Sequence, residues 1–383
     1  MSILKSILQV LLLALVAPYL YDRYTFLSTM IANRPGKLQN IRSFESYGVK
    51  YQDRLRNCED VILEESLGVA FLSCDPGRDR WNTVMGSFQP EKGSSDHGGL
   101  WIYDYASPNL SDTDRLKQLD VDEPDLHPLG IAFDAGTSTL YVVNHSRHTK
   151  SHILILNIDM QTLTTTLVAR LQHDLLHAPN SIEIIDKNEL YITNDHYLRS
   201  ATSPLLSKIE TFSGAPGGSI VYINTRSPSS AKIVGRVPFA NGITLLNSTT
   251  VAVSSSSKYG VYLFSISAEK SLLFQRIITV PAAPDNLSRD SRGALLVAGH
   301  PFAPALMGVA QSRAECRVTG VGADCNCTAP SWVGEWSEAG GLKTLYRDDG
   351  GEFCSSTTVV RDLERGVGIV SGLYERGVLV FRT

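Results

Sequence analysis

Oxygen-bearing side chains recur at matching places along the chain, each at the start of a β-rich segment. The set is Glu59, Asn180, Asn241, Asp285 and Asn286. Two carboxylates and three carboxamides are hard donors of the kind Ca²⁺ prefers, with a combined charge of about −2. Taken singly, "NG" and "DN" pairs are typical turn residues. Their recurrence at equivalent positions predicts a shared calcium site with room left for water or substrate.

Repeated β segments must bring these side chains together. After residue 30 the sequence lacks a sustained amphipathic helix, and short runs such as "LYVVN", "LYITN" and "TVAVSS" recur between turn residues. The repeated units start near Glu59, Leu129, Asn180, Asn241, Asp285 and Ser356.

This order predicts an all-β protein, a six-bladed β-propeller with four strands per blade. The strand-like "GLWIYDY" between Cys74 and Leu129 leaves a seven-bladed count open. Because the first strand of each blade lines the channel of a propeller, we expect the five side chains to converge on its axis.

The ends of the chain set the predicted domain boundaries. Residues 1–20 contain Lys5 followed by an apolar run, which predicts an apolar helix that acts as a signal peptide or signal anchor. Residues 21–57 form an N-terminal extension and 58–383 the propeller. We therefore expect a protein of the secretory pathway, secreted or held on a membrane by this segment. The formal charge of −4 and the absence of Lys/Arg clusters argue against a nucleic-acid partner.

Six cysteines agree with an oxidising compartment. An antiparallel hairpin centred on Ser66 would place Cys58 opposite Cys74, and the resulting disulfide would contribute about 3 kcal/mol. Among the other four, Cys325 and Cys327 are too close to bond each other easily, which leaves two connectivities. Residues 302–335 are expected to be a disulfide-stapled insertion between the fifth and sixth blades.

Sequons for N-glycosylation compete with the proposed ligands. They occur at Asn109, Asn144, Asn247, Asn286 and Asn326. Asn109 and Asn247 lie in polar turns and are predicted to carry glycans, whereas Asn286 is predicted to face the cation and carry none.

Several stretches resemble the serum paraoxonase/arylesterase family, within the gluconolactonase-like superfamily of six-bladed propellers, over nearly the whole chain. They are "CEDVILE", "HPLGIAF", "LYVVNH", "PNSIEII", "LYITNDHY", "FANGI", "PDNLS" and "AGHP". The resemblance implies a Ca²⁺-dependent hydrolase of lactones and aryl esters with small lipophilic substrates. It also implies that the five residues above bind the catalytic calcium, and it places Asp195 and His196 near the pocket.

The sequence departs from the family pattern at two places. Leu129 stands where a catalytic histidine precedes the "GI" of animal paraoxonases, whereas the partner of that histidine is retained as His145. A second, structural calcium would use Asp60, the carbonyl of Ile131 and a carboxylate at the position that is Ser181 here, so that site is weakened.

A mechanism follows from these residues. Ca²⁺ would polarise the carbonyl while His145, or alternatively Asp285, activates water or attacks. The segment from His196 to Gly218 has apolar residues at helical spacing and predicts a lid over the channel mouth or a membrane contact. A non-catalytic, calcium-bearing propeller that serves as a binding scaffold is the alternative favoured by Leu129. Carbon–nitrogen bond formation is disfavoured by the complete ligand set, and serine-hydrolase chemistry by the lack of GxSxG.

Overall fold

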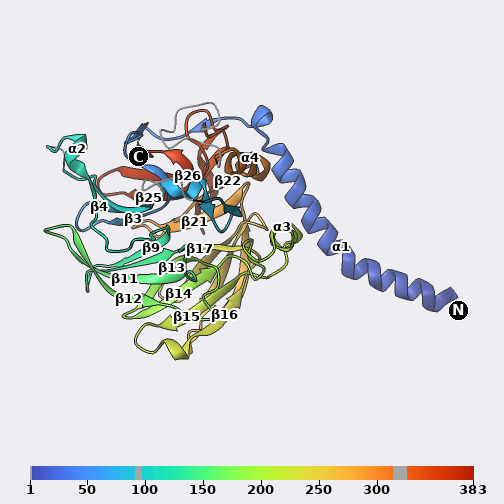
Figure 1. Cartoon of the computed structure of the whole chain (residues 1–383). Helices are drawn as coiled ribbons and strands as arrows, with labels where there is room; N and C mark the ends of the chain where they lie inside the picture. The colour runs from blue at the N-terminus through green and yellow to red at the C-terminus, as the bar shows by residue number, and fades with distance from the viewer. Residues whose placement is uncertain (1, 91–96, 108, 314–325) are drawn as a thin grey trace.

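A ring of antiparallel sheets forms the body of the protein, and a long helix projects from it (Figure 1). The computed structural model describes residues 2–90, 97–107, 109–313 and 326–383. The protein is mostly β, as the sequence predicts.

Six inner strands each contain one of the predicted unit starts. These strands are β3 (Arg56–Glu64), β9 (Pro128–Asp134), β13 (Pro179–Asp186), β17 (Ala240–Asn247), β21 (Ala283–Arg289) and β25 (Ser356–Asp362). Each contacts the next, and β25 contacts β3, so the inner strands close a ring. Each predicted unit start therefore lies on a strand of this ring.

Each inner strand continues outward through antiparallel neighbours. Three sheets have four strands in chain order, built by adding β10 (Thr139–Asn144), β11 (His152–Asp159), β12 (Thr164–Leu171); β14 (Glu189–Asn194), β15 (Ser219–Asn224), β16 (Lys232–Arg236); and β18 (Thr250–Ser255), β19 (Gly260–Ile266), β20 (Leu272–Thr279). A fourth sheet joins β21 to β22 (Leu295–His300), β23 (Ser331–Ser337), β24 (Gly341–Asp348) and the short β1 (Ile41–Arg42).

The two ends of the chain share one eight-stranded sheet. It contains β3 and β25 with β2 (Ser46–Lys50), β4 (Val69–Cys74), β7 (Gly99–Asp104), β8 (Leu116–Gln118), β26 (Val367–Arg376) and β27 (Val378–Arg382). β27 pairs with β2, and β26 pairs with β3, so early and late segments are hydrogen-bonded together. The "GLWIYDY" strand is β7, which pairs with β4 and belongs to the same sheet as β3 rather than to a separate unit.

The strands next to the inner ones, β10, β14, β18 and β22, are buried on both faces, which explains their nearly continuous apolar runs. In β10, Leu140 and Val142 pack with Leu100 in one core cluster, whereas Val143 packs with Ile182 in the next. Full burial of each such side chain contributes about 1.5–3 kcal/mol.

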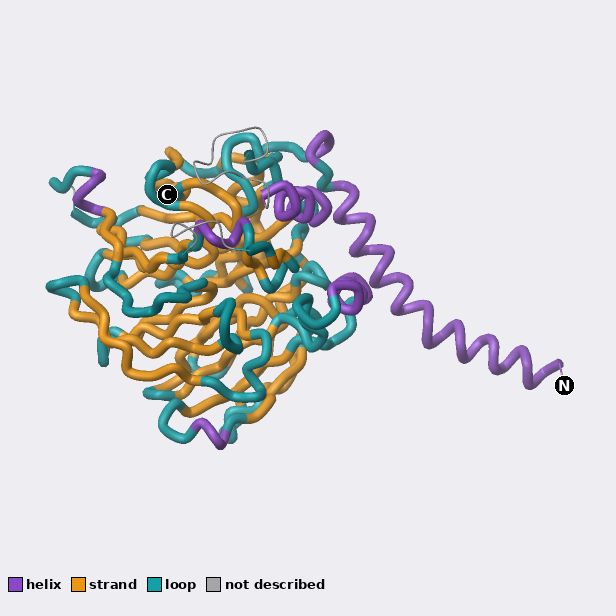
Figure 2. The backbone as a smooth tube through the Cα atoms, in the orientation of Figure 1, coloured by secondary structure: helices purple, strands orange, loops and turns teal. Residues whose placement is uncertain are grey.

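The remaining elements are short, and several lie at one end of the ring. They are η1 (Pro35–Lys37), η2 (Pro76–Asp79), β5 (Trp81–Asn82), β6 (Ser87–Phe88), α2 (Asp112–Arg115), α3 (Pro204–Ser213), η3 (Pro228–Ser230) and α4 (Ala303–Arg313). α1, α3 and α4 lie on the same side of the strand body (Figure 2). α3 lies in the segment that the sequence predicts to be a lid, and α4 lies in the predicted insertion.

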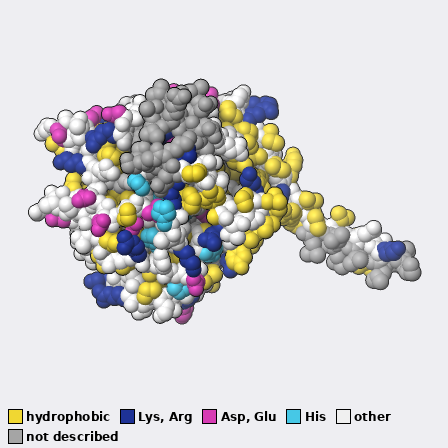
Figure 3. All heavy atoms as spheres, viewed as in Figure 1, with side chains coloured by type: hydrophobic (Ala, Val, Ile, Leu, Met, Phe, Trp, Pro, Cys, Tyr) yellow, Lys and Arg dark blue, Asp and Glu magenta, His cyan; other side chains and the backbone are white. Residues whose placement is uncertain are grey.

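The N-terminal helix α1 extends over Ser2–Ala32, past the predicted boundary at residue 20. Its last turns pack on the body: Arg23 donates to the Phe212 and Ser257 carbonyls at 3.0 and 2.9 Å, and the ring of Phe26 contacts that of Tyr259. Earlier apolar residues are exposed along the projecting part (Figure 3). Among the described residues, no helix has both the length and the hydropathy of a membrane span.

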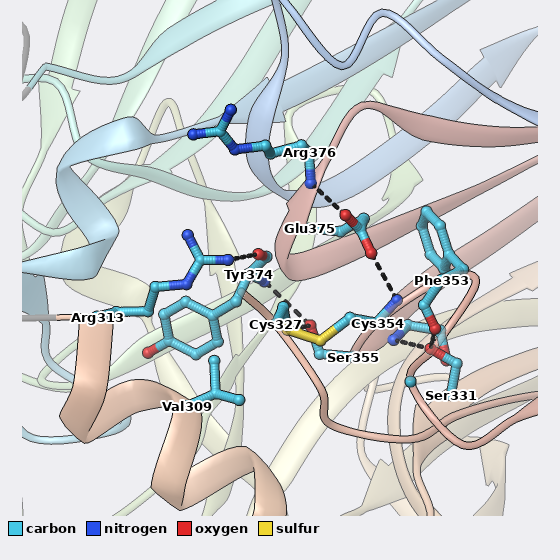
Figure 4. Close-up of a disulfide and its surroundings, with 12 residues drawn as sticks. Val309, Arg313, Cys327, Ser331, Phe353, Cys354, Ser355, Tyr374, Glu375 and Arg376 are labelled. Atoms are coloured by element: carbon cyan, nitrogen blue, oxygen red, sulfur yellow. Dashed lines mark hydrogen bonds between the residues drawn. A yellow bond between two sulfur atoms is a disulfide. The ribbon is translucent and has the colours of Figure 1, made fainter. Parts of the chain in front are cut away.

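The disulfides confirm one pairing and select another. Cys58 and Cys74 face each other in the β3–β4 hairpin and are bonded, as predicted. Cys327 is bonded to Cys354 beside Val309 of α4 (Figure 4), which selects one of the two connectivities for the other cysteines. Cys316 and Cys325 lie outside the described residues.

The predicted insertion over 302–335 needs correction. Ser331–Ser337 forms β23, which pairs with β22, so the inserted segment ends before Ser331. It also separates two strands of one sheet and not two successive sheets. The reason is that "SWVGEWS" forms a strand, whereas the closely spaced cysteines before it indicated a disulfide-stapled loop that continued to residue 335.

Candidate active site

A cavity of about 240 Å³ opens at the end of the ring where the inner strands start. Its walls include Phe26 of α1, Phe212 of α3 and Leu306 of α4. We call it the central cavity. Its floor contains four of the predicted ligands, namely Glu59, Asn180, Asn241 and Asp285. The fifth, Asn286, contacts this floor, because its amide nitrogen donates to Glu59 Oε1 at 3.0 Å. The five residues are therefore brought together by four inner strands.

Glycines allow this convergence. A Cβ on Gly242 would lie 2.6 Å from the Cα of Asn286, and a Cβ on Gly130 would lie 2.4 Å from the Asn180 carbonyl oxygen. Because such contacts are too close for any side chain, only glycine lets neighbouring inner strands approach this tightly. Gly130 therefore allows the close approach of the strand that carries Asn180, and Gly242 that of the strand that carries Asn286.

Four buried oxygens at the floor lack a hydrogen-bond partner. They are Glu59 Oε2, Asn180 Oδ1, Asn241 Oδ1 and Asn286 Oδ1. Buried polar atoms normally find partners, because an unpaired acceptor costs about 1–3 kcal/mol. Unpaired acceptors from one predicted donor set are what a hard cation requires, so the residues present fit Ca²⁺.

The charges at the floor lead to the same conclusion. Burial, followed by the nearby charges of Asp60 and Asp285, raises the pKa of Glu59 well above its ordinary value, and Arg78 opposes the rise. A cation would relieve this cost. No group of three or more His, Cys, Asp or Glu side chains arranged for a metal occurs among the described residues, because carboxamides supply much of this donor set.

A histidine that sequence reasoning did not assign lies next to Asp285. His300 ends β22, lines the central cavity and places Nε2 2.8 Å from Asp285 Oδ2. Since the carboxylate accepts, Nε2 carries the hydrogen, and the buried Nδ1 has no partner. The pair can hold a neutral imidazole with a free lone pair. The sequence signal for His300 is the hairpin register: Ala283 is paired with His300 across β21 and β22, so His300 lies beside the start of β21 that carries Asp285.

His145 lies elsewhere. It is buried outside the cavity lining, where Nε2 donates to the Pro179 carbonyl at 2.6 Å and Nδ1 accepts from the Thr83 hydroxyl. Burial lowers the pKa of His145 despite the Pro179 contact. Both ring nitrogens are engaged within the wall, an arrangement typical of a packed structural histidine. Its sequence-assigned role as base stays a prediction that this geometry does not favour.

The other expected pocket residues are separated by the structure. Leu129 lines the central cavity with its apolar side chain. Asp195 and His196 lie behind the cavity wall: His196 Nδ1 is 2.9 Å from Asp195 Oδ1, and Nε2 is 2.6 Å from Thr211 Oγ1 of α3. They connect the end of β14 to the helix that covers the cavity.

The residues expected at a second calcium do not fit one. Asp60, Ile131 and Ser181 line a separate cavity of about 520 Å³ further along the inner strands. Asp60 already accepts hydrogen bonds at both oxygens, from the Val61 and Ile131 amides and the Thr358 hydroxyl. Burial raises the pKa of Asp60 to about 6. The Ile131 amide donates to Asp60 Oδ2, the oxygen that a second ion would need.

The sequence is similar to that of known proteins. The family model described as Arylesterase matches residues 87–317. The chain is 28% identical over 283 residues to serum paraoxonase/lactonase 3 of Oryctolagus cuniculus, covering 70% of this chain and 73% of that protein. It is also 28% identical over 265 residues to serum paraoxonase/lactonase 3 of Homo sapiens, covering 63% and 66%.

Among solved structures, a protein assigned as a gluconolactonase aligns with a TM-score of 0.53 at 12% identity, over 90% of this chain and 97% of that one. At this identity the likeness concerns the fold alone, and it is a propeller-like one.

Proposed function

Because the chain belongs to the arylesterase family, we propose that it hydrolyses lactones or aryl esters at the central cavity with a bound Ca²⁺. The observation that carries the proposal is the set of four unpaired, buried oxygens at the cavity floor. They come from four inner strands and need a hard cation to satisfy them.

The proposed architecture is a six-bladed propeller. The closed ring of β3, β9, β13, β17, β21 and β25 supports this count. The eight-stranded sheet then contains two blades, one led by β3 and the other by β25, joined where β26 pairs with β3. In the second of these, the early strand β2 completes a blade made from the end of the chain.

Each cavity residue has a defined part in the proposed reaction. Glu59, Asn180, Asn241, Asp285 and Asn286 would hold Ca²⁺, which supplies polarisation of the carbonyl and stabilises negative charge as it develops.

His300 would accept a proton from water at Nδ1, and Asp285 Oδ2 holds the ring in the tautomer that leaves Nδ1 free. Leu129, Phe239 and Leu306 supply an apolar wall that excludes water and receives the lipophilic part of the substrate.

Calcium-dependent stability tests the proposal. Adding Ca²⁺ to EDTA-treated protein should raise Tm, because the ion binds the folded chain. Asn241→Ala should reduce that shift and lower hydrolysis of aromatic esters and γ- or δ-lactones. Asn247→Ala, which changes an exposed asparagine of the same strand, should leave both unchanged. Absence of any Ca²⁺-dependent shift in the wild type would remove the metal from the proposal.

A non-catalytic scaffold is the second candidate, and a specific observation favours it. Leu129 presents an apolar surface to the cavity, and His145 is sealed in the wall, so neither supplies acid–base chemistry. This candidate predicts a normal Ca²⁺-dependent rise in Tm with no turnover on the ester and lactone panel. Turnover that EDTA abolishes would reject it.

We further propose entry into the secretory pathway and association with a membrane. α1 exposes Val10, Leu13 and Tyr24, and α3 exposes Leu205 and Ile209, on neighbouring helices. Such apolar faces bind at lipid interfaces. In vesicle flotation the full chain should rise with the lipid, and a chain lacking residues 2–20 should rise less. Equal flotation of the two proteins, or none, would contradict the anchoring role of α1.

A further inference from the structure

Arg78 is a buried cation in the wall of the central cavity. It belongs to η2, directly after β4, and its side chain is 3% exposed. Its terminal NH2 donates to the Pro128 carbonyl at 2.5 Å, while Nε is buried without a partner. Within the described part of the chain, the guanidinium makes this single hydrogen bond and no ion pair with a carboxylate.

Other buried or partly buried arginines of the protein are paired. Arg56 forms an ion pair with Asp79, Arg313 lies 3.8 Å from the same carboxylate, and Arg361 is paired with Asp290. Pairing is the rule because an isolated buried charge is strongly unfavourable. Arg78 departs from this rule in the wall of a cavity, where a ligand could supply the missing anion.

The charge balance of the cavity leads in the same direction. When Ca²⁺ is bound, Glu59 and Asp285, the two carboxylates that line the cavity, would be engaged by the ion and not by Arg78. Arg78 then has no carboxylate partner within a wall that is otherwise largely apolar, including Val84 and Met85. A low-dielectric pocket that holds an unpaired positive charge attracts a monoanion.

We propose that Arg78 binds a carboxylate carried by the substrate, so that the cavity selects lactones or esters bearing a carboxylate next to an apolar part. A guanidinium suits this role because its planar donors match the two oxygens of a carboxylate. The substrate class rests on the proposed hydrolase function, whereas binding of the carboxylate rests only on the bound Ca²⁺.

The wild-type protein gives the first test. A γ-lactone with a ring carboxylate is compared with the same lactone bearing a carboxamide, which has nearly the same shape and no charge. The carboxylate should be preferred in kcat/KM on the order of 10- to 100-fold, the scale of a hydrogen bond to a charged group. Most of this preference should persist at high salt, because a buried charge is poorly screened.

Two variants assign the preference to Arg78. Arg78→Gln should bring the two lactones to within about 3-fold of each other, mainly through a higher KM for the carboxylate. Lys208→Gln is the matched control, because Lys208 is an exposed cation at the rim of the same cavity, and it should keep the wild-type preference. If Arg78 had a merely structural role, Arg78→Gln would lower kcat/KM equally for both lactones.

Calorimetric titration with cyclopentanecarboxylate measures binding without turnover. Ca²⁺-loaded wild type should bind it at least 10-fold more tightly than Arg78→Gln does, and should not bind the carboxamide comparably. If the wild type hydrolyses both lactones equally, the Arg78 inference is overturned while the hydrolase function stands. If neither lactone is hydrolysed but the carboxylate binds through Arg78, the anion site stands and the hydrolase function fails.

Discussion

At the scale of single residues, the ligand set and the base differ in how far sequence could predict them. Glu59, Asn180 and Asn241 start repeated units, so their convergence follows from the repeat once a ring is assumed. The environment of His145 does not follow, because the Thr83 hydroxyl and the Pro179 carbonyl that engage its ring come from distant segments. The residue type of His145 suits a general base, but the sequence does not show whether its ring faces the cavity.

His300→Gln should therefore lower kcat by roughly 10²-fold, the usual contribution of a general base, while the Ca²⁺-dependent rise in Tm is retained. His145→Gln should mainly lower Tm, because it breaks two buried hydrogen bonds outside the cavity. Steady-state kinetics and melting curves of both variants provide the measurement. Full activity in His300→Gln would transfer the role of base to Asp285, and a selective loss of kcat in His145→Gln would restore the sequence-based assignment.

At the scale of elements, strands were predictable and the parts that cover the cavity were only partly so. Five of the six inner strands have polar residues near their start, and that pattern marks them in the sequence, whereas β9 begins with Pro128 and Leu129. η2 has no such periodicity, so the placement of Arg78 in the cavity wall could not be foreseen. α4 buries Leu306, Val309 and Ala310 at helical spacing, but Pro304 and Gly308 weaken the helical signal.

The docking of α3 should depend on pH through His196. Burial disfavours the charged ring, but the hydrogen bond and charge of Asp195, followed by the charge of Glu210, outweigh it and raise the pKa of His196. The ring of His196 also contacts the Thr211 hydroxyl and the ring of Phe239, and the His196 carbonyl accepts from His177 Nε2 at 2.9 Å.

Because the pKa is raised in the folded state, this contribution to stability is complete below the unfolded value near 6.5. It is lost as pH rises through the folded value. Urea unfolding from pH 6 to 9 should show this loss in the wild type and a flatter profile in His196→Gln. The exposed His148 gives a control, since His148→Gln should follow the wild type. Parallel profiles for wild type and His196→Gln would refute the assignment.

At the scale of the whole molecule, closure of the ring explains why residues from several repeated units meet at a single site. Pairing of β26 with β3 and of β27 with β2 unites the ends of the chain, so the inner strands cannot splay and the floor of the cavity is fixed. The repeat spacing predicts the ring, but it does not reveal that the early strand β2 pairs with β27 at the end of the chain. That strand lies before the first repeated unit, and nothing in "SYGVK" marks its distant partner.

The closed ring also divides the sequons into accessible and inaccessible ones. Asn109 and Asn247 are exposed, whereas Asn144 and Asn286 are buried. Asn326 is exposed but precedes Cys327, whose disulfide would form beside it. A transferase that requires an accessible asparagine in an extended segment can reach the first pair after folding has begun, but not the second pair in the finished ring.

We expect glycan at Asn109 and Asn247 and none at Asn286 when the protein is made in a eukaryotic secretory host. The physical reason is that Asn286 is 2% exposed and its amide nitrogen is bonded to Glu59, while its Oδ1 faces the proposed ion. Glycopeptide mass spectrometry measures occupancy at each site. Asn109→Gln and Asn247→Gln should each remove one glycan and retain the Ca²⁺-dependent rise in Tm. Substantial occupancy of Asn286 would be incompatible with calcium binding by that side chain, and the proposed active site would fail with it.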